Sequence, residues 1–297
     1  MRALAAFLAA ILGSLLVAAL LAWPAWLAAH AIDASLQFHR VVSRLWLLIL
    51  LAGLLLVLRR LGIRGRDDWG YGLPRPVFLR QAGLGFAVGV ATMLPMTIAM
   101  AALGILRLRP EFGAAALAEA VLAGLAAGLG VAVLEETFFR GVMYRAIERE
   151  SGFALAATGT TLVYAAIHFF ARSKVPAEDV VGDSGLRLLA GSLENFAHPL
   201  PVLDSFLTLF VVGLLLAFVR RRTGAIAAPI GLHMGWVAVM KATIVTTRVN
   251  EDAAASFLVG SFDGYTGWLV AAWSGILFAV AWARGWLAPG NKGDGHL

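Results

Sequence analysis

Two adjacent carboxylates, Glu135 and Glu136, lie inside a strongly apolar stretch and are followed by Arg140. Ionisable side chains are costly in hydrocarbon and usually mark functional sites there. On a helix, Glu136 and Arg140 are four residues apart and share one face, so they can form an ion pair. Glu135 points about 100° away from Glu136, which leaves its carboxylate free to face other groups. A carboxylate in a low-dielectric cavity can act as a general base toward water.

Two histidines in apolar surroundings, His168 and His233, are candidates to join Glu135. Glu135 and His168 each lie about 15 residues from a predicted turn near residue 151, or roughly 22–24 Å along antiparallel helices. His233 lies about 11 residues past Arg222, or roughly 16 Å along its own helix. Arg140, Arg145 and Arg149 indicate that the fourth helix projects beyond the lipid, so the shared level is shallower than these lengths, and we predict one polar site reached from the cytoplasm. A carboxylate and two imidazoles can activate water, and they also have the composition of a zinc site.

The rest of the chain indicates that these groups lie inside a membrane. Of the 297 residues, 60% are hydrophobic and 14% are charged, and the mean hydropathy is +0.83. The charged fraction is far below that of a soluble domain. We therefore predict an all-α fold, a polytopic transmembrane bundle of about eight helices, with a short interfacial helix at 186–196. The expected membrane helices are 3–28, 41–61, 78–105, 115–147, 153–171, 203–221, 225–247 and 266–287.

Charge and cysteine content narrow the compartment and the partners. Basic residues cluster beside the apolar runs, so the net charge of +6 indicates membrane topology and no nucleic-acid partner. The distribution of arginine predicts both termini in the cytoplasm, and the preference for arginine over lysine favours a bacterial inner membrane. The absence of cysteine excludes disulfides, a cysteine nucleophile and thiolate metal ligands. We divide the chain into helices one to three with a cytoplasmic loop (1–114), a core of helices four to seven (115–247), and a last helix with a polar tail (248–297).

Three short motifs resemble those of the CAAX-protease and bacteriocin-processing family of intramembrane endopeptidases. Glu135-Glu-Thr-Phe-Phe-Arg140 matches its Glu-Glu-x-x-x-Arg motif, and Tyr164-Ala-Ala-Ile-His168 is similar to its aromatic-x-x-x-His motif. His233-Met-Gly-Trp-Val237 is similar to its His-x-x-x-Asn/Asp motif, except for the valine at the last position. The motifs occur in the family's order, on the fourth, fifth and seventh predicted helices.

The resemblance implies an integral-membrane endopeptidase that cleaves a membrane-embedded or lipid-anchored protein or peptide with a water activated by Glu135. It implies that Glu136 and Arg140 support the site, and that His168 and His233 position the water and the oxyanion. Members of this family have been described both as metal-dependent and as glutamic-type. The resemblance therefore leaves two alternatives: a divalent metal such as zinc, held by Glu135, His168 and His233, or a mechanism without a cofactor.

Val237 is the position at which the chain departs from the family pattern. A valine cannot donate a hydrogen bond to an oxyanion, so His233, a backbone N–H or a loop residue such as Asn195 would have to do so. The substitution favours an alternative reading, in which a catalytically silent family member acts as a membrane scaffold or a bacteriocin-immunity factor. Replacing Glu135 by Gln separates the two, because only an endopeptidase depends on that base.

Overall fold

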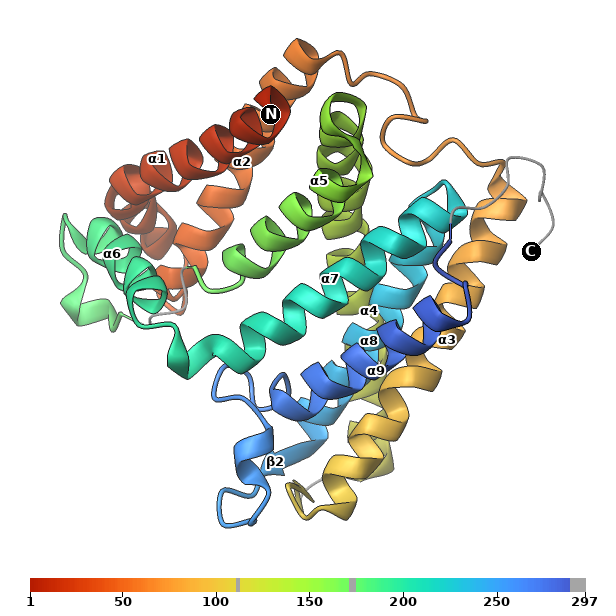
Figure 1. Cartoon of the computed structure of the whole chain (residues 1–297). Coiled ribbons are helices and arrows are strands. Elements are labelled where there is room, and N and C mark those ends of the chain that lie inside the picture. The colour runs from red at the N-terminus through yellow and green to blue at the C-terminus, as the bar shows by residue number, and fades with distance from the viewer. Residues whose placement is uncertain (111–112, 171–174, 289–297) are drawn as a thin grey trace.

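The protein is an α-helical bundle with one small β-ribbon (Figure 1). The computed structural model describes residues 1–110, 113–170 and 175–288. In these residues the elements are α1 (Arg2–Ile32), α2 (Phe38–Leu61), α3 (Arg75–Ala102), β1 (Leu106–Leu108), α4 (Ala114–Glu136), the π-helix η1 (Thr137–Met143), α5 (Tyr144–Ile167), η2 (Ala177–Asp179), α6 (Ser184–Ala197), η3 (Leu200–Val202), α7 (Leu203–Thr223), α8 (Ala227–Thr246), β2 (Thr247–Val249), η4 (Ser256–Leu258) and α9 (Trp268–Ala283).

Each predicted membrane segment is helical, and the chain is an integral membrane protein. Within the described residues, six helical stretches are long and apolar enough to cross a membrane. One of them, Ala114–Ile167, is 54 residues long and contains two helices, because Gly152 turns the chain with a φ of 80°. The second of these helices ends at Ile167, and residue 171, its predicted end, lies outside the described residues. The last predicted segment is α9, whose 16 residues are apolar but fewer than the roughly 20 that a span needs.

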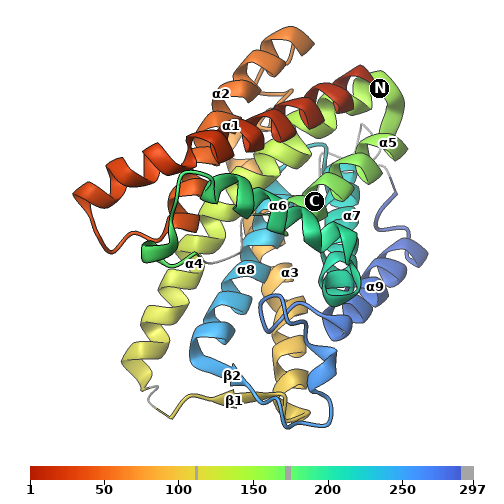
Figure 2. The ribbon, with the colours of Figure 1, turned by 90° about the vertical axis from the view of Figure 1, so that its left-hand side faces the viewer.

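Pairs of glycines bring α8 into close contact with both α3 and α4. The pairs, each four residues apart, are Gly85 and Gly89 on α3, Gly124 and Gly128 on α4, and Gly231 and Gly235 on α8. A Cβ on Gly89 would lie 2.5 Å from the Leu232 carbonyl oxygen, and one on Gly128 would lie 2.8 Å from the Met234 carbonyl oxygen. Backbones therefore meet directly, as small residues at helix interfaces in membranes allow. Figure 2 shows α4, α8 and α3 side by side, and this packing holds the helix that carries His233.

Two features of the fold are absent from the sequence-based prediction. The chain passes from α4 to α5 through the π-helix η1 instead of a regular α-helix. The strands β1 and β2 form an antiparallel ribbon in which Leu106 pairs with Val249, at the ends of α3, α4 and α8 (Figure 2). A short helix, expected at 186–196, is present as α6, which packs on α1. There, a Cβ on Gly185 would overlap the Ala19 carbonyl oxygen.

Two apolar clusters flank the polar residues. The first joins α1, α2, η1, α5 and α7, and includes Phe139 and Tyr164. The second joins α3, α7, α8 and α9, and includes Leu216 and Trp236. Helix α7 belongs to both clusters, and in Figure 1 it crosses the molecule between α5 and α9.

Candidate active site

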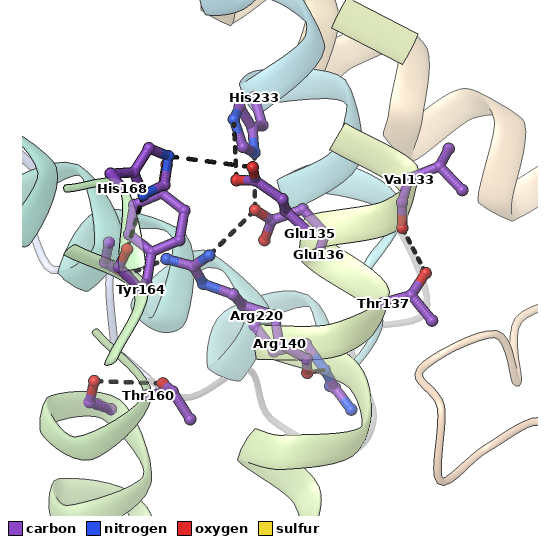
Figure 3. A network of polar contacts seen from close by, with 12 residues as sticks. Val133, Glu135, Glu136, Thr137, Arg140, Thr160, Tyr164, His168, Arg220 and His233 are labelled. Atoms are coloured by element: carbon purple, nitrogen blue, oxygen red, sulfur yellow. Dashed lines mark hydrogen bonds and ion pairs between the residues drawn. The ribbon is translucent and has the colours of Figure 1, made fainter. Parts of the chain in front are cut away.

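Glu135 and Glu136 are the last two residues of α4, at the point where it continues into η1 (Figure 3). The side chain of Glu136 is fully buried, whereas that of Glu135 keeps 19% of its surface exposed. Arg140, in η1, is fully buried. Because successive helical residues point in different directions, one carboxylate enters the packed interior and the other lines a cavity.

Glu136 forms a buried ion pair with Arg140, as the four-residue spacing predicts. Arg140 Nη1 lies 3.1 Å from Glu136 Oε1. The guanidinium also lies 4.5 Å from the centre of the Tyr164 ring, and its Nη2 donates to the Gly213 carbonyl oxygen at 3.1 Å. A buried ion pair offsets its desolvation cost only when further contacts satisfy both ions. The aromatic ring and the carbonyl oxygen provide such contacts for Arg140.

His233 connects α8 to both carboxylates. Its Nδ1 lies 2.8 Å from Glu136 Oε1, and its Nε2 lies 3.9 Å from Glu135 Oε2. Because a carboxylate accepts hydrogen bonds, Nδ1 is the protonated nitrogen of this contact. The imidazole is only 4% exposed, so this contact fixes the orientation of the ring and turns Nε2 toward Glu135.

His168, at the C-terminal end of α5, presents the same nitrogen to Glu135. Its Nδ1 lies 2.7 Å from the Tyr164 carbonyl oxygen, which can only accept, so Nδ1 carries a proton here as well. Its Nε2 lies 3.9 Å from Glu135 Oε1. A carbonyl partner on Nδ1 is a common way to fix the orientation of a functional histidine. The two imidazoles therefore face Glu135 with the same ring atom.

The distances from Glu135 to the two imidazoles suit bridging by water. A separation of 3.9 Å is too long for a direct hydrogen bond, whereas one water with hydrogen bonds of roughly 2.8 Å can bridge it. Glu135 Oε2 is buried and has no hydrogen-bond partner within the described residues. Buried polar atoms are nearly always paired with protein or with ordered water, so this oxygen is suited to hold a water in the site.

An apolar cavity of about 950 Å³ leads to Glu135 between α2 and α4. Its lining includes Leu50, Leu54, Val133 and Phe138. Trp69 and Tyr71, from the loop between α2 and α3, also line it, and the Tyr71 hydroxyl lies 2.6 Å from Thr137 Oγ1. Concave apolar sites with a few convergent polar groups are typical binding sites. The convergent polar group here is the candidate base.

The structure places all five predicted site residues in one connected group. The sequence analysis missed the hydrogen bond between Glu136 and His233, because a spacing argument pairs Glu136 with Arg140 alone. It also missed Gly213, whose contribution is a backbone carbonyl and carries no side-chain signal. Val237 is buried, one turn past His233 on α8. The side chain of Asn195, considered above as a donor, lies outside the described residues.

Comparison with known proteins points to the same region. Residues 117–239 match a family described as Rce1-like, type II CAAX prenyl endopeptidase Rce1-like. No curated protein and no solved structure matches the chain significantly. The matched residues include the C-terminal part of α4, η1, α5, α7 and most of α8, and with them all three motifs. The similarity to the Rce1-like family of type II CAAX prenyl endopeptidases therefore covers the part of the chain that carries the candidate site.

Proposed function

We propose that the protein is an intramembrane endopeptidase that hydrolyses a peptide bond of a membrane-associated protein or peptide with a water activated by Glu135. The observation that supports this proposal is the convergence of His168 and His233 on Glu135. Each histidine places its Nε2 3.9 Å from an oxygen of the Glu135 carboxylate. The family match supports proteolysis in general. The base, the roles of the histidines and the catalytic type are parts of the proposal.

In the proposed reaction, a water bound among these three side chains gives a proton to Glu135. The water oxygen then bonds to the carbonyl carbon of the substrate, and the carbonyl oxygen becomes an oxyanion. When this intermediate collapses, the carbon–nitrogen bond breaks and Glu135 returns the proton to the departing amine. One water is consumed and two new chain ends form. General base catalysis of this kind contributes about 10²–10⁴-fold to the rate.

The histidines and the ion pair support this chemistry in different ways. One hydrogen of the water points to Glu135, and the neutral Nε2 of His168 or His233 accepts a hydrogen bond from the other, which aims the water oxygen at the substrate. An imidazole that takes this proton over from Glu135 becomes a donor at Nε2 and can stabilise the oxyanion, and it hands the proton back to Glu135 before the amine departs. Glu136 and Arg140 do not touch the water. They hold the His233 ring in the required orientation.

A metal ion is the other way in which these three side chains could activate water. The partners of the two Nδ1 atoms, a carboxylate and a carbonyl oxygen, are those that orient metal-binding histidines. The separations of 3.9 Å are longer than the roughly 3.4 Å between ligands of a tetrahedral zinc ion. The described residues contain no cluster of His, Asp or Glu with metal-site spacing. A zinc ion would require the three side chains to move closer together, whereas a water fits the observed separations of 3.9 Å. We therefore propose a glutamic-type mechanism.

The apolar cavity supports a substrate that reaches the site from the bilayer. Its apolar lining suits a lipid chain or a transmembrane segment and offers few polar groups to a soluble peptide. We therefore propose a membrane-embedded or lipid-anchored substrate. The arginines of the loop between α2 and α3, and Arg220–Arg222 at the end of α7, support the placement of this end of the bundle in the cytoplasm of a bacterial cell.

Cleavage of membrane-anchored peptides tests the proposal. The full-length protein and its Glu135→Gln variant are reconstituted in nanodiscs with a library of peptides that carry either a lipid anchor or a transmembrane segment. Products are identified by mass spectrometry. We expect the wild type to yield discrete cleavage products and Glu135→Gln to form them at least about 10²-fold more slowly. Equal product formation by the two proteins would show that Glu135 is not the base.

A further inference from the structure

Helix α7 carries none of the three motifs, yet it holds Arg140 at two points. The Gly213 carbonyl oxygen accepts a hydrogen bond from Arg140 Nη2 at 3.1 Å. Arg220 Nε donates to the backbone carbonyl oxygen of Arg140, also at 3.1 Å (Figure 3). Gly213 and Arg220 are seven residues apart, which is about two helical turns, so they lie on one face of α7. Both are buried.

The second of these contacts acts on the backbone of the π-helix. In a π-helix the hydrogen bonds connect residues five apart, and such turns are rare outside functional sites. Arg140 lies in the middle of η1, and the guanidinium of Arg220 adds a charged donor to its carbonyl oxygen. Charge-assisted hydrogen bonds are roughly twice as strong as neutral ones. Arg220 therefore stabilises the local backbone geometry that places Arg140.

From Arg140, an unbroken series of contacts leads to the proposed water site. Arg140 Nη1 lies 3.1 Å from Glu136 Oε1, and that same oxygen lies 2.8 Å from His233 Nδ1. Nε2 on the other side of the imidazole faces Glu135 at 3.9 Å. Glu136 and Arg140 are fully buried, so solvent cannot take the place of a lost contact. A shift of Arg140 therefore moves Glu136 and changes the orientation of the His233 ring.

The contact at Gly213 requires the absence of a side chain. A Cβ at this position would lie 2.7 Å from Thr161 Cγ2 and 3.1 Å from Arg140 Nη2. The first distance is shorter than real Cβ contacts, and the second is tighter than nearly all of them. Any larger residue would push α7 away from α5 and η1, or would displace the guanidinium from the carbonyl oxygen. Either movement weakens the hydrogen bonds by which α7 holds Arg140.

We propose that Gly213 and Arg220 are positioning residues of the active site, which act through Arg140 and Glu136 on the orientation of His233. The effect on catalysis rests on the proposed function, whereas the effect on His233 does not. Neither residue touches the proposed water. Misplacement of a catalytic group by about 1 Å can cost about 10²-fold in rate, so loss of either contact should slow catalysis without removing a reacting group.

Four substitutions in the full-length protein separate positioning from general packing. Gly213→Ala adds a Cβ that displaces the Arg140 guanidinium from the Gly213 carbonyl oxygen, and Arg220→Gln removes the charged donor to the Arg140 carbonyl oxygen. Gly275→Ala is the control for the glycine, since a Cβ there has no atom within 4 Å. Arg221→Gln is the control for the arginine, because the Arg221 guanidinium lies 4.0 Å from the Phe153 ring centre, away from the hydrogen bonds that hold Arg140. The proteins are prepared in nanodiscs with ¹⁵N-labelled histidine, and a His233→Gln sample assigns the imidazole signals.

We expect Gly213→Ala and Arg220→Gln to shift the His233 nitrogen signals. With a membrane-anchored peptide that the wild type cleaves, both variants should lower kcat by about 10²-fold while KM stays unchanged. Both controls should match the wild type. Arg220→Lys, which keeps a charged donor, should recover part of the loss. If Gly213→Ala fails to fold, Arg220→Gln and Arg220→Lys decide the question.

Unchanged His233 signals in a folded Arg220→Gln protein would overturn the proposal, whatever happens to activity. A fall in activity with unchanged signals would point to packing instead of positioning, and would overturn it as well. The magnetic resonance readout needs no substrate. If the wild type cleaves no peptide, the proposed function fails, while the His233 signals still decide whether α7 positions that ring.

Discussion

At the scale of single residues, the two adjacent glutamates have different surroundings and therefore different expected roles. Glu136 is fully buried between Arg140 and His233, whereas Glu135 keeps some exposure and has one oxygen without a hydrogen-bond partner in the described structure. Removing one partner of a buried ion pair leaves the other charge uncompensated. Removing a charge that faces a cavity leaves no such stranded partner.

Glu136→Gln should therefore destabilise the protein much more than Glu135→Gln does. Breaking a buried pair costs about 3–5 kcal/mol, and the change at Glu136 leaves Arg140 in that state. We expect a clear fall in the unfolding midpoint for Glu136→Gln and little change for Glu135→Gln, measured by denaturant unfolding in detergent. Equal losses of stability would mean that Glu135 is also a structural charge.

Val237 provides a second test at this scale. It lies one turn past His233 and is buried, so an asparagine there would bring a donor to the side of α8 that carries His233. A single oxyanion donor is worth about 10²–10³-fold in turnover. We expect Val237→Asn to raise kcat in the peptide cleavage assay. A folded Val237→Asn protein with lower activity would show that this position packs against substrate or lipid.

The sequence indicated which polar residues would lie near one another, because charge in an apolar run is a local and unambiguous signal. The pairing of Glu136 with Arg140 and the approach of His168 and His233 to Glu135 followed from helical spacing and depth. The hydrogen bond from His233 to Glu136 depends on the rotation of α8 against α4, which spacing along a single helix does not determine. The carbonyl of Gly213 could not be predicted, since every residue has one.

At the scale of elements, the loop between α2 and α3 is tied to the structure at several points. Asp68 accepts hydrogen bonds from the backbone N–H groups of Arg64 and Gly65 and forms an ion pair with Arg149. Burial alone would raise the pKa of Asp68, but these hydrogen bonds and the charge of Arg149 hold it below the usual 3.8. The same loop carries Trp69 and Tyr71, which line the cavity.

Acid should therefore loosen this loop. Because the pKa of folded Asp68 is lowered, the ionised carboxylate stabilises the folded state above pH 3.8, and this contribution is lost as the pH falls through the folded pKa. We expect Asp68→Asn to melt at a lower temperature than the wild type at pH 6. The difference between the two melting temperatures should become steadily smaller below pH 3.8. A difference that does not depend on pH would show that Asp68 contributes by its shape alone.

The helices were predictable because long apolar runs in a membrane can only be helical when they meet lipid. The β-ribbon and the π-helix were not. Leu106–Leu108 is only three residues long, and its partner Thr247–Val249 lies far away in the sequence, so no local pattern indicates the pairing. The π-helix η1 packs against α5 and α7, where Arg220 donates to the Arg140 carbonyl oxygen, and these contacts exist only in the folded bundle.

At the scale of the whole molecule, the candidate site lies where α4, α5, α7 and α8 meet, between two apolar clusters. Its polar groups are held by four helices, and the cavity beside them is largely apolar. The burial of Glu136, Arg140 and His233 strengthens the electrostatic interactions among them. Whether a metal ion binds among these groups can be tested on the intact protein.

Treatment with a chelator tests the proposed glutamic-type mechanism. We expect peptide cleavage by the full-length protein to persist after prolonged exposure to EDTA, and elemental analysis to find no stoichiometric zinc. The spacing of Glu135 from the two imidazoles is the reason for this expectation. Loss of cleavage that zinc alone restores would instead place an ion among Glu135, His168 and His233.

The apolar cavity between α2 and α4 has a consequence for the kinetics of any substrate. Among its lining residues, Leu51, Leu55 and Leu134 are exposed on the bundle, so in a bilayer they meet acyl chains. Those chains then compete with the substrate for the same space, and a substrate that arrives from the bilayer is diluted by lipid instead of by water. The relevant concentration is the number of substrate molecules per lipid. Adding empty lipid to a reconstituted sample of fixed volume should slow the reaction, although the amounts of protein and peptide stay the same.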